Sequence, residues 1–141
     1  MNMISGELPS SIGNLKQLQI LSLYNNELVG QIPTSLYEID TLKTLLLSSN
    51  KLSGKLAHGV VNFKSLENLS LFDNNLEGQV PLELEKLRNL KEMNISYNMF
   101  SGLVSKNLAS LDTLNMTMLN DKGVAIVLEV AKDNTAIAAE D

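Results

Sequence analysis

The stretch that decides the fold is Leu18-Gln-Ile-Leu21-Ser-Leu23-Tyr-Asn-Asn26-Glu-Leu28-Val-Gly30-Gln-Ile32-Pro33. Its pattern returns along the chain with a period of 24 residues. Three sets of residues keep this spacing: Asn2, Asn26, Asn50, Asn74 and Asn98; Gly6, Gly30, Gly54, Gly78 and Gly102; and Leu18, Leu42, Leu66, Leu90 and Leu114. A fixed period of this length predicts a repeat architecture in which each unit is one small structural element.

Within each unit, apolar and other residues alternate around two central positions. In the quoted stretch these are Leu21 and Leu23. Such alternation predicts a short β-strand with one buried face. A single unit cannot bury its apolar face alone, so neighbouring units must stack and share a core. The sequence therefore predicts an α/β repeat solenoid: an arc with a parallel concave β-sheet, one short strand per repeat, and loops or 3-10 turns on the convex side.

The unit resembles the leucine-rich repeat L-x-x-L-x-L-x-x-N-x-L. With its 24-residue length and G-x-I-P segment, it is similar to the plant-type repeats of receptor-kinase ectodomains and polygalacturonase-inhibiting proteins. The resemblance covers about residues 1–119 and implies that the asparagine amides bond the backbone of adjacent turns. The members of this ladder would be Asn26, Asn50, Asn74 and Asn98. Their bonds would satisfy backbone groups that are costly to bury unpaired.

We expect one leucine-rich-repeat domain over residues 1–132. It comprises a partial repeat at 1–17, repeats from about 18, 42, 66 and 90, and a degenerate capping repeat at 112–132. Val124–Ala131 has helical patterning, expected as part of this cap, and residues 133–141 are expected to form a flexible tail. Ala57 and Ser105 replace the convex proline of other repeats, which should loosen those loops.

The chain begins inside a repeat, at Asn2, without the Cys-bearing N-terminal cap that the resemblance implies. The favoured interpretation is a fragment of a longer protein. In the alternative, a partner or a second copy covers the first strand's open edge, which would give self-association through that edge.

Composition disfavours several classes of partner and chemistry. The net charge is −5 and the 11 Lys and Arg residues are dispersed, which argues against nucleic acid. No apolar run is long enough to span a bilayer, so no membrane insertion by this segment is expected. Without cysteine there is no thiolate chemistry, and a lone His58 cannot assemble a usual metal site. The paired acids Glu83 and Glu85 should merely solvate the convex side. We expect no catalytic residue, metal or cofactor.

The 24-residue register assigns side chains to the concave sheet. The outward positions start at Ile20, Ser22 and Tyr24 and reach Met116 and Met118 in the fifth strand. From these columns and their flank we expect a partner-binding patch, because clustered exposed aromatics are typical of interface hot spots. Its members are Tyr24, Leu46, Phe72, Asp73 and Tyr97. The alternatives are a solvated sheet surface, or Tyr97 leaning over Phe100 to cap the core.

Three segments match the acceptor for N-glycosylation, Asn-x-Ser/Thr. They begin at Asn68, Asn94 and Asn115. Because Asn-x-Ser also follows from the repeat consensus, the motif alone is a weak signal. If the protein is secreted, glycans on Asn68 and Asn94 would narrow the concave face.

The leading functional hypothesis is a non-catalytic recognition module, part of a receptor-like protein, that binds a protein or peptide on its concave face. The resemblance slightly favours an extracellular or cell-surface location. The alternative is a secreted, polygalacturonase-inhibitor-like protein that blocks a cell-wall-degrading hydrolase. A third interpretation is an accessory repeat of a catalytic protein whose active site lies elsewhere.

Overall fold

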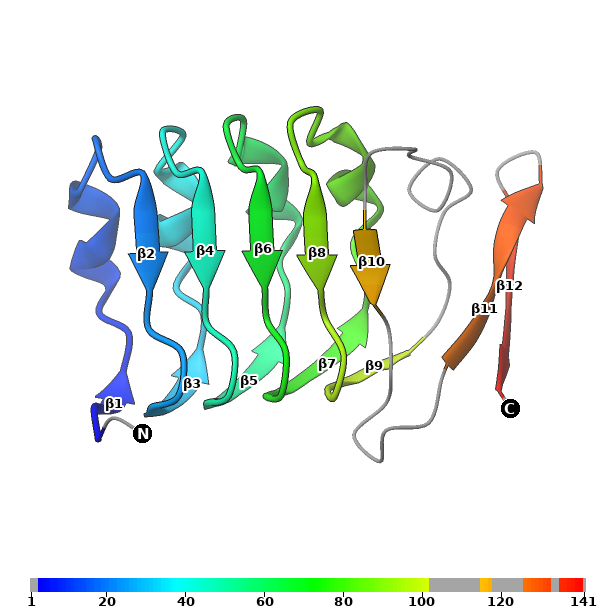
Figure 1. The fold of residues 1–141 in the computed structure, drawn as a ribbon, viewed down its shortest axis with the longest axis horizontal. Coiled ribbons are helices and arrows are strands. Elements are labelled where there is room, and N and C mark those ends of the chain that lie inside the picture. Colours follow the sequence, from blue (N-terminus) through cyan, green and yellow to red (C-terminus); the bar gives the residue numbers. More distant parts are fainter. Residues whose placement is uncertain (1–2, 102–114, 118–125, 133–134, 141) are drawn as a thin grey trace.

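The protein is a stack of parallel repeats, which confirms the predicted leucine-rich-repeat solenoid (Figure 1). A computed structural model describes residues 3–101, 115–117, 126–132 and 135–140 of the chain. In each complete unit a short strand leads into a second strand and then into a 3-10 helix. The chain then returns to the next repeat beside the first.

The concave side is a five-stranded parallel sheet in the order β10-β8-β6-β4-β2. Its strands are β2 (Ile20–Ser22), β4 (Thr44–Leu46), β6 (Asn68–Ser70), β8 (Glu92–Asn94) and β10 (Asn115–Thr117). From β2 to β8 the register follows the 24-residue period, with Ile20, Thr44, Asn68 and Glu92 side by side. One short strand per repeat is as the sequence predicts.

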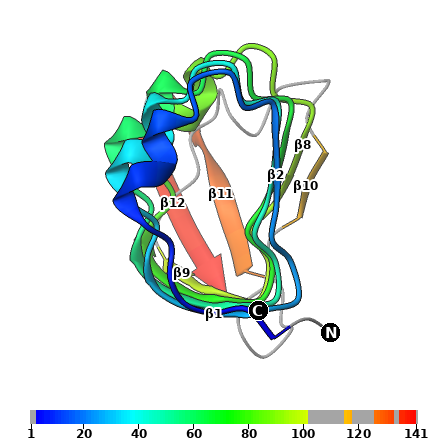
Figure 2. The same ribbon diagram turned by 90° about the vertical axis from the view of Figure 1, so that its left-hand side faces the viewer.

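A second five-stranded parallel sheet, which the sequence analysis did not predict, adjoins the first. Its strands are β1 (Ser5–Glu7), β3 (Glu27–Gln31), β5 (Lys51–Lys55), β7 (Asn75–Gln79) and β9 (Met99–Ser101). Viewed along the stack, the concave sheet and the second sheet form adjoining walls, and the short helices lie across from the concave sheet (Figure 2). The cross-section therefore has three sides around one core.

The convex side is built from four 3-10 helices within residues 3–101. They are η1 (Ser10–Asn14), η2 (Thr34–Glu38), η3 (His58–Asn62) and η4 (Leu82–Lys86). Three of them follow a proline, whose ring fixes φ near the extended value that the helix entry requires. The observed φ is −75° at Pro9, −66° at Pro33 and −63° at Pro81.

The core is filled mainly by leucine columns from all three sides. Leu36, Leu42, Leu47, Leu52 and Leu66 each have no exposed surface. Leu21 and Leu23 of the first complete unit are only half-buried, because the stack contributes less cover at that end. Burial in each repeat thus depends on a neighbour, as expected for stacked units.

Buried asparagines tie successive repeats together through their side-chain amides. Asn50 accepts a hydrogen bond from the backbone N–H of Leu28 at 3.1 Å. Its Nδ2 donates to the carbonyl oxygens of Leu23, Leu47 and Ser48 at 2.9, 3.1 and 3.2 Å. The amides at the matching positions make corresponding bonds: Asn26, Asn74 and Asn98. The structure therefore contains the hydrogen-bond ladder that the family resemblance implies.

The residue before each ladder asparagine has left-handed backbone geometry. The φ angles are 58° at Asn25, 56° at Ser49, 59° at Asp73 and 57° at Tyr97. Asparagine and aspartate tolerate this region, whereas a tyrosine there is unusual and strained. These four residues form one row along the rim of the concave face.

The glycine column in the second sheet has a different cause. Gly54 has φ +80°, and a Cβ there would lie 2.7 Å from Cγ of Gln31 in the preceding repeat. Gly78 similarly has φ +83° and would crowd the side chain of Lys55. Both the backbone conformation and the close approach exclude a side chain, which fits the sequence-based interpretation of this column.

Ala57 does not loosen its loop, contrary to the sequence-based expectation. Its backbone N–H donates to the hydroxyl of Tyr37 at 3.3 Å, a bond that proline could not make. Tyr37 is 2% exposed, and its ring meets Phe63 edge to face at 5.3 Å. Burial raises the pKa of the Tyr37 hydroxyl, and the bond from Ala57 partly offsets that rise. The missing proline thus satisfies a buried polar atom of the previous repeat.

The fifth concave strand corrects the predicted register by one residue. Asn115, and not Met116, lies opposite Glu92, and Met116 lies opposite Met93. A one-residue shift exchanges the two faces of a strand, so Met116 takes the register position that Met93 fills in the core. Asn115 and Thr117 take the outward positions that the sequence analysis gave to Met116 and Met118.

Near the C-terminus the structure shows an antiparallel hairpin of β11 (Ile126–Lys132) and β12 (Thr135–Glu140). This differs from the expected helical patterning at Val124–Ala131 and from the tail expected at 133–141. The strand rests on Ile126, Val127 and Val130, since β-branched residues suit a pleated strand.

We predict that Asn50→Ala lowers the free energy of unfolding by about 1–3 kcal/mol, because the N–H of Leu28 loses its acceptor within the core. Urea denaturation would measure the change. The matched control is Asn75→Ala, since Asn75 is exposed on β7 and should tolerate the change. Asn25 is a poor control, because alanine is disfavoured at its φ of 58°. Equal losses for Asn50→Ala and Asn75→Ala would contradict the ladder's contribution.

We also predict that Ala57→Pro destabilises the wild type by about 1 kcal/mol, because the hydroxyl of Tyr37 loses its donor. In a Tyr37→Phe background the same change should stabilise by about 0.4–1 kcal/mol, since Ala57 already has φ −79° and proline restricts the unfolded chain. A double-mutant cycle measures the coupling. Additive effects would show that the bond contributes nothing.

Candidate functional site

The concave sheet presents alternate side chains away from the core. Polar residues hold most of these positions: Ser22, Thr44, Ser48, Asn68, Ser70, Glu92 and Asn94. The apolar exceptions are Ile20, which is 63% exposed, Leu46 and Phe72, which are half-buried, and Tyr24 at the rim. Apolar side chains on an otherwise polar surface are the feature that needs an explanation.

Phe72 and Tyr97 form an aromatic pair at the rim of this face. Their ring centroids lie 5.2 Å apart with the planes at 71°, an edge-to-face arrangement. Such pairs contribute about 0.5–1.5 kcal/mol beyond the area that they bury. Tyr97 keeps 36% of its surface exposed. Its ring therefore meets Phe72, whereas one alternative interpretation placed it over Phe100.

Backbone hydrogen bonds fix Tyr97 in its left-handed conformation. The N–H of Asn74 donates to the carbonyl of Tyr97 at 3.2 Å, and the N–H of Asp73 donates to the carbonyl of Ser96 at 3.0 Å. The adjacent Asn98 is 1% exposed and bonded in the ladder. The tyrosine ring is thus held in place before any partner arrives.

The structure places the other residues of the predicted patch at different distances from the pair. Asp73 is exposed and directly follows Phe72. Leu46 pairs with Ser70 in the register of the neighbouring strand, near the same rim. Tyr24 is 50% exposed, but a whole strand separates it from Phe72. The compact part of the patch is therefore Leu46, Phe72, Asp73 and Tyr97.

One residue of the predicted outward column is not available at all. Ser96 is 1% exposed, and its hydroxyl donates to Oδ1 of Asn94 at 2.8 Å. Its backbone N–H donates to the same oxygen at 3.1 Å. This local turn closes the column beside Phe72, and no feature of the 24-residue period distinguishes it.

A polar groove of about 410 Å³ follows the same rim, between the turns of successive repeats. Its lining includes the charged side chains of Glu27, Lys51 and Asp73, with Asn25 and Ser49 from the left-handed row. The sequence analysis did not predict it, because the groove depends on the second sheet. It places charged and amide groups next to the aromatic pair.

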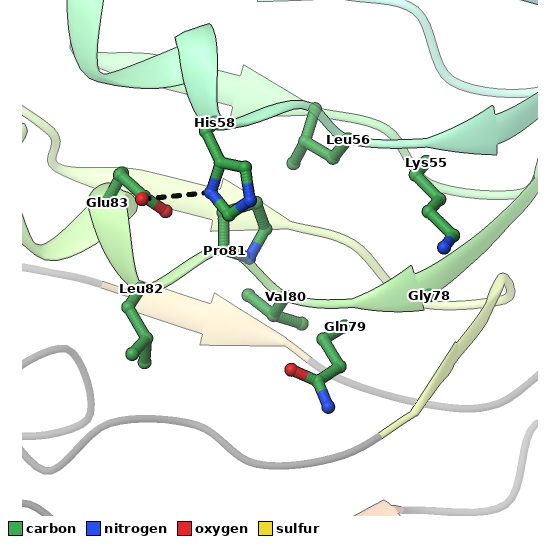
Figure 3. Close-up of a pocket in the computed structure, with 9 residues that line it drawn as sticks. All are labelled: Lys55, Leu56, His58, Gly78, Gln79, Val80, Pro81, Leu82 and Glu83. Atoms are coloured by element: carbon green, nitrogen blue, oxygen red, sulfur yellow. Dashed lines mark hydrogen bonds and ion pairs between the residues drawn. The ribbon is translucent and has the colours of Figure 1, made fainter.

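A second groove, of about 420 Å³, lies away from the concave face, beside η3 and η4 (Figure 3). Nδ1 of His58 lies 2.9 Å from Oε2 of Glu83, and this hydrogen bond holds the pKa of the Glu83 carboxyl below its usual value. The sequence analysis treated His58 as an isolated surface residue. The pairing escaped notice because the two residues are 25 positions apart, one more than the repeat.

Neither groove offers a catalytic or metal-binding arrangement. Within the described ranges, no group of three or more His, Cys, Asp or Glu side chains could hold a metal ion. In the same part of the chain, no helix has both the length and the hydropathy to cross a membrane. His58 is highly exposed, so its contact with Glu83 is an ordinary surface pair.

Comparison with known proteins identifies the family. The model of the leucine-rich repeat region matches residues 1–122. Phytosulfokine receptor 1 of Arabidopsis thaliana is 41% identical over 49 residues, which make up 35% of this chain and 5% of that protein. This chain is therefore similar in sequence to a small part of a plant receptor.

Solved structures of plant receptors share the fold. The plant peptide hormone receptor RGFR1 in complex with RGF2 is 30% identical, with a TM-score of 0.81 over 92% of this chain and 20% of that one. PEPR1 with AtPEP1 is 34% identical, with a TM-score of 0.77 over 84% of this chain and 18% of that one. The chain thus spans about a fifth of either receptor chain. It belongs to the leucine-rich repeat family, with repeats of the plant type found in receptor ectodomains.

Proposed function

We propose that the concave face binds a protein or peptide, as part of a receptor-like protein. The observation that carries this proposal is the exposed edge-to-face pair of Phe72 and Tyr97 on an otherwise polar sheet. The comparisons support it, because RGFR1 and PEPR1 are each described in complex with a peptide, RGF2 and AtPEP1. Protein partners are therefore more plausible for this fold than small molecules.

The pair has the physical properties of a binding anchor. Interfaces draw most of their affinity from a few aromatic or arginine side chains within a polar surround. Here the surround is Asp73 and the hydroxyls of Ser48 and Ser70. The conformation of Tyr97 is already fixed by the backbone, so binding would cost little further side-chain entropy. Tyr24, across one strand, would extend the contact.

The proposed function is non-catalytic binding, as is general for this repeat family. The alternative of a secreted hydrolase inhibitor gains no support from the plant receptors named above. No feature of the described residues favours it over a receptor-like function.

We also propose that Asn68, Asn94 and Asn115 accept N-glycans if the chain enters a glycosylating compartment. The hydroxyl and N–H of Ser96 occupy only Oδ1 of Asn94, so the bonds described leave its Nδ2 without a partner. A glycan there, or on Asn68, would flank Phe72. Modification at either position would therefore compete with binding at the aromatic pair.

Peptide selection tests the proposed function. Random twelve-residue peptides displayed on phage would be selected on the immobilised chain, and the recovered peptides synthesised for calorimetry. Phe72→Ala and Tyr97→Asn should each weaken their binding at least tenfold, which is about 1.4 kcal/mol. Tyr97→Asn should also raise the melting temperature, because asparagine tolerates a positive φ better than tyrosine.

The matched control is Ser49→Asn, at the same left-handed position one repeat away from Asp73. It should leave the melting temperature and the affinity nearly unchanged. If instead both aromatic variants keep full affinity, and Leu82→Ala on η4 loses it, the binding site lies on the other side of the solenoid.

A further inference from the structure

The exposed apolar side chains of the concave face follow a line that crosses the strands. Ile20, Leu46 and Phe72 are each 26 residues apart, which is one repeat and two residues. Each step therefore moves to the next strand and two positions along it. Tyr97 continues the line beyond Phe72 through the aromatic pair. We call Ile20, Leu46, Phe72 and Tyr97 the oblique stripe.

The strand register fixes this geometry. Ile20 pairs with Thr44, two residues before Leu46, and Leu46 pairs with Ser70, two residues before Phe72. Neighbouring strands lie about 4.8 Å apart, and two residues span about 6.6 Å along a strand. Successive members of the stripe are thus about 8 Å apart, on a line inclined about 36° to the strands.

The positions beside the stripe are polar. Ser22 and Ser70 flank Leu46 on the two neighbouring strands, and Thr44 lies next to Ile20. Asn68 lies beyond Thr44 on β6. An apolar ligand surface that ran straight along one column would therefore meet hydroxyls or amides after one contact. Only the oblique direction offers consecutive apolar contacts.

Opposite charges mark the two ends of the stripe. Lys43 directly precedes β4 at the Ile20 end, and Asp73 directly follows Phe72 at the other end. Both residues are exposed, and neither forms an ion pair within residues 3–101. Nearby, by contrast, Lys91 and Glu67 neutralise each other at 3.5 Å. Two unpaired charges of opposite sign give the stripe a direction.

We propose that the ligand is an extended peptide segment lying along the oblique stripe, with its basic end at Asp73 and its acidic end at Lys43. This inference rests on the proposed function and adds the path, the polarity and the specificity residues Ile20 and Leu46. The spacing of about 8 Å lies between every second residue of a β-strand, about 6.6 Å, and every third residue of a polyproline II helix, about 9.3 Å. The segment therefore carries apolar residues at every second or third position, and complementary charge aligns its ends.

The test uses the peptides selected on the complete chain. Ile20→Ser and Leu46→Ser should each weaken binding at least fivefold, whereas Ser22→Ala and Thr44→Ala, beside the stripe, should change it less than twofold. Since Ile20 is 63% exposed, its replacement should not alter the melting temperature. Leu46→Ser requires that check, and Leu46→Thr offers a milder change if it fails.

Polarity has its own measurement. Asp73→Asn should weaken peptides with a basic residue at one end, and Lys43→Gln those with an acidic residue at the other, each at least threefold at low salt. Reversing the order of the peptide's residues should abolish the sensitivity to both variants.

The outcomes separate the two proposals. Binding that depends on Phe72 and Tyr97 but not on Ile20 or Leu46 would overturn the oblique path and leave the proposed function intact. Equal losses from Ser22→Ala and Leu46→Ser would overturn it as well. Binding that is indifferent to Phe72 and Tyr97 would remove the proposed function itself.

Discussion

The buried asparagine amide is the constraint on which the rest of the structure depends. Each repeat must turn sharply from the concave strand into the second sheet, and that turn leaves carbonyls and an N–H inside the core. A single side chain satisfies several of them at once: Nδ2 of Asn50 donates to three carbonyls, and Oδ1 accepts from Leu28. Since unpaired backbone groups are costly to bury, the turn can lie against the core only with such a group in place.

The rim of the concave face is a product of the same turn. For the asparagine to point inward, the residue before it adopts a positive φ, which places Asn25, Ser49, Asp73 and Tyr97 in one exposed row. This row carries chemistry that varies from repeat to repeat, because the ladder constrains its backbone and not its side chains. Tyr97 is the member that conforms least well to the conformation. Rigid scaffolds that present variable side chains in fixed places are well suited to recognition.

The sequence could predict what repeats and not what breaks the repeat. The period of 24 residues locates the core leucines, the ladder asparagines and the glycines, because each of these roles recurs at one position. The second sheet was missed, since Glu27–Gln31 has one buried side chain and a glycine in place of a clear alternation. Pairings between unlike repeats were also missed. The bond between Ser96 and Asn94 is one example, and His58 with Glu83 is another.

The slip at β10 shows the same limit at the level of register. A period carried forward from Glu92 reaches Met116, but the strand pairs one residue earlier. The apolar demand of the core decides this, because Met116 suits the position beside Met93 better than Asn115 does. The proposed site depended less on periodicity than on chemistry. Its residues stand out because they are apolar where the neighbouring repeats are polar.

Tyr37 and Ala57 show that neighbouring repeats are matched to each other. The hydroxyl of Tyr37 needs the N–H that a proline would remove, and Gly59 leaves room for its ring, since a Cβ there would approach Cδ2 of Tyr37 to 3.0 Å. The second repeat therefore accepts the third behind it and would reject a copy that carries proline. Such one-sided fits encode the order of the repeats, much as a keyed joint allows parts to be assembled in only one sequence. A shuffled stack of the same units would share the outline of the solenoid but not its fit.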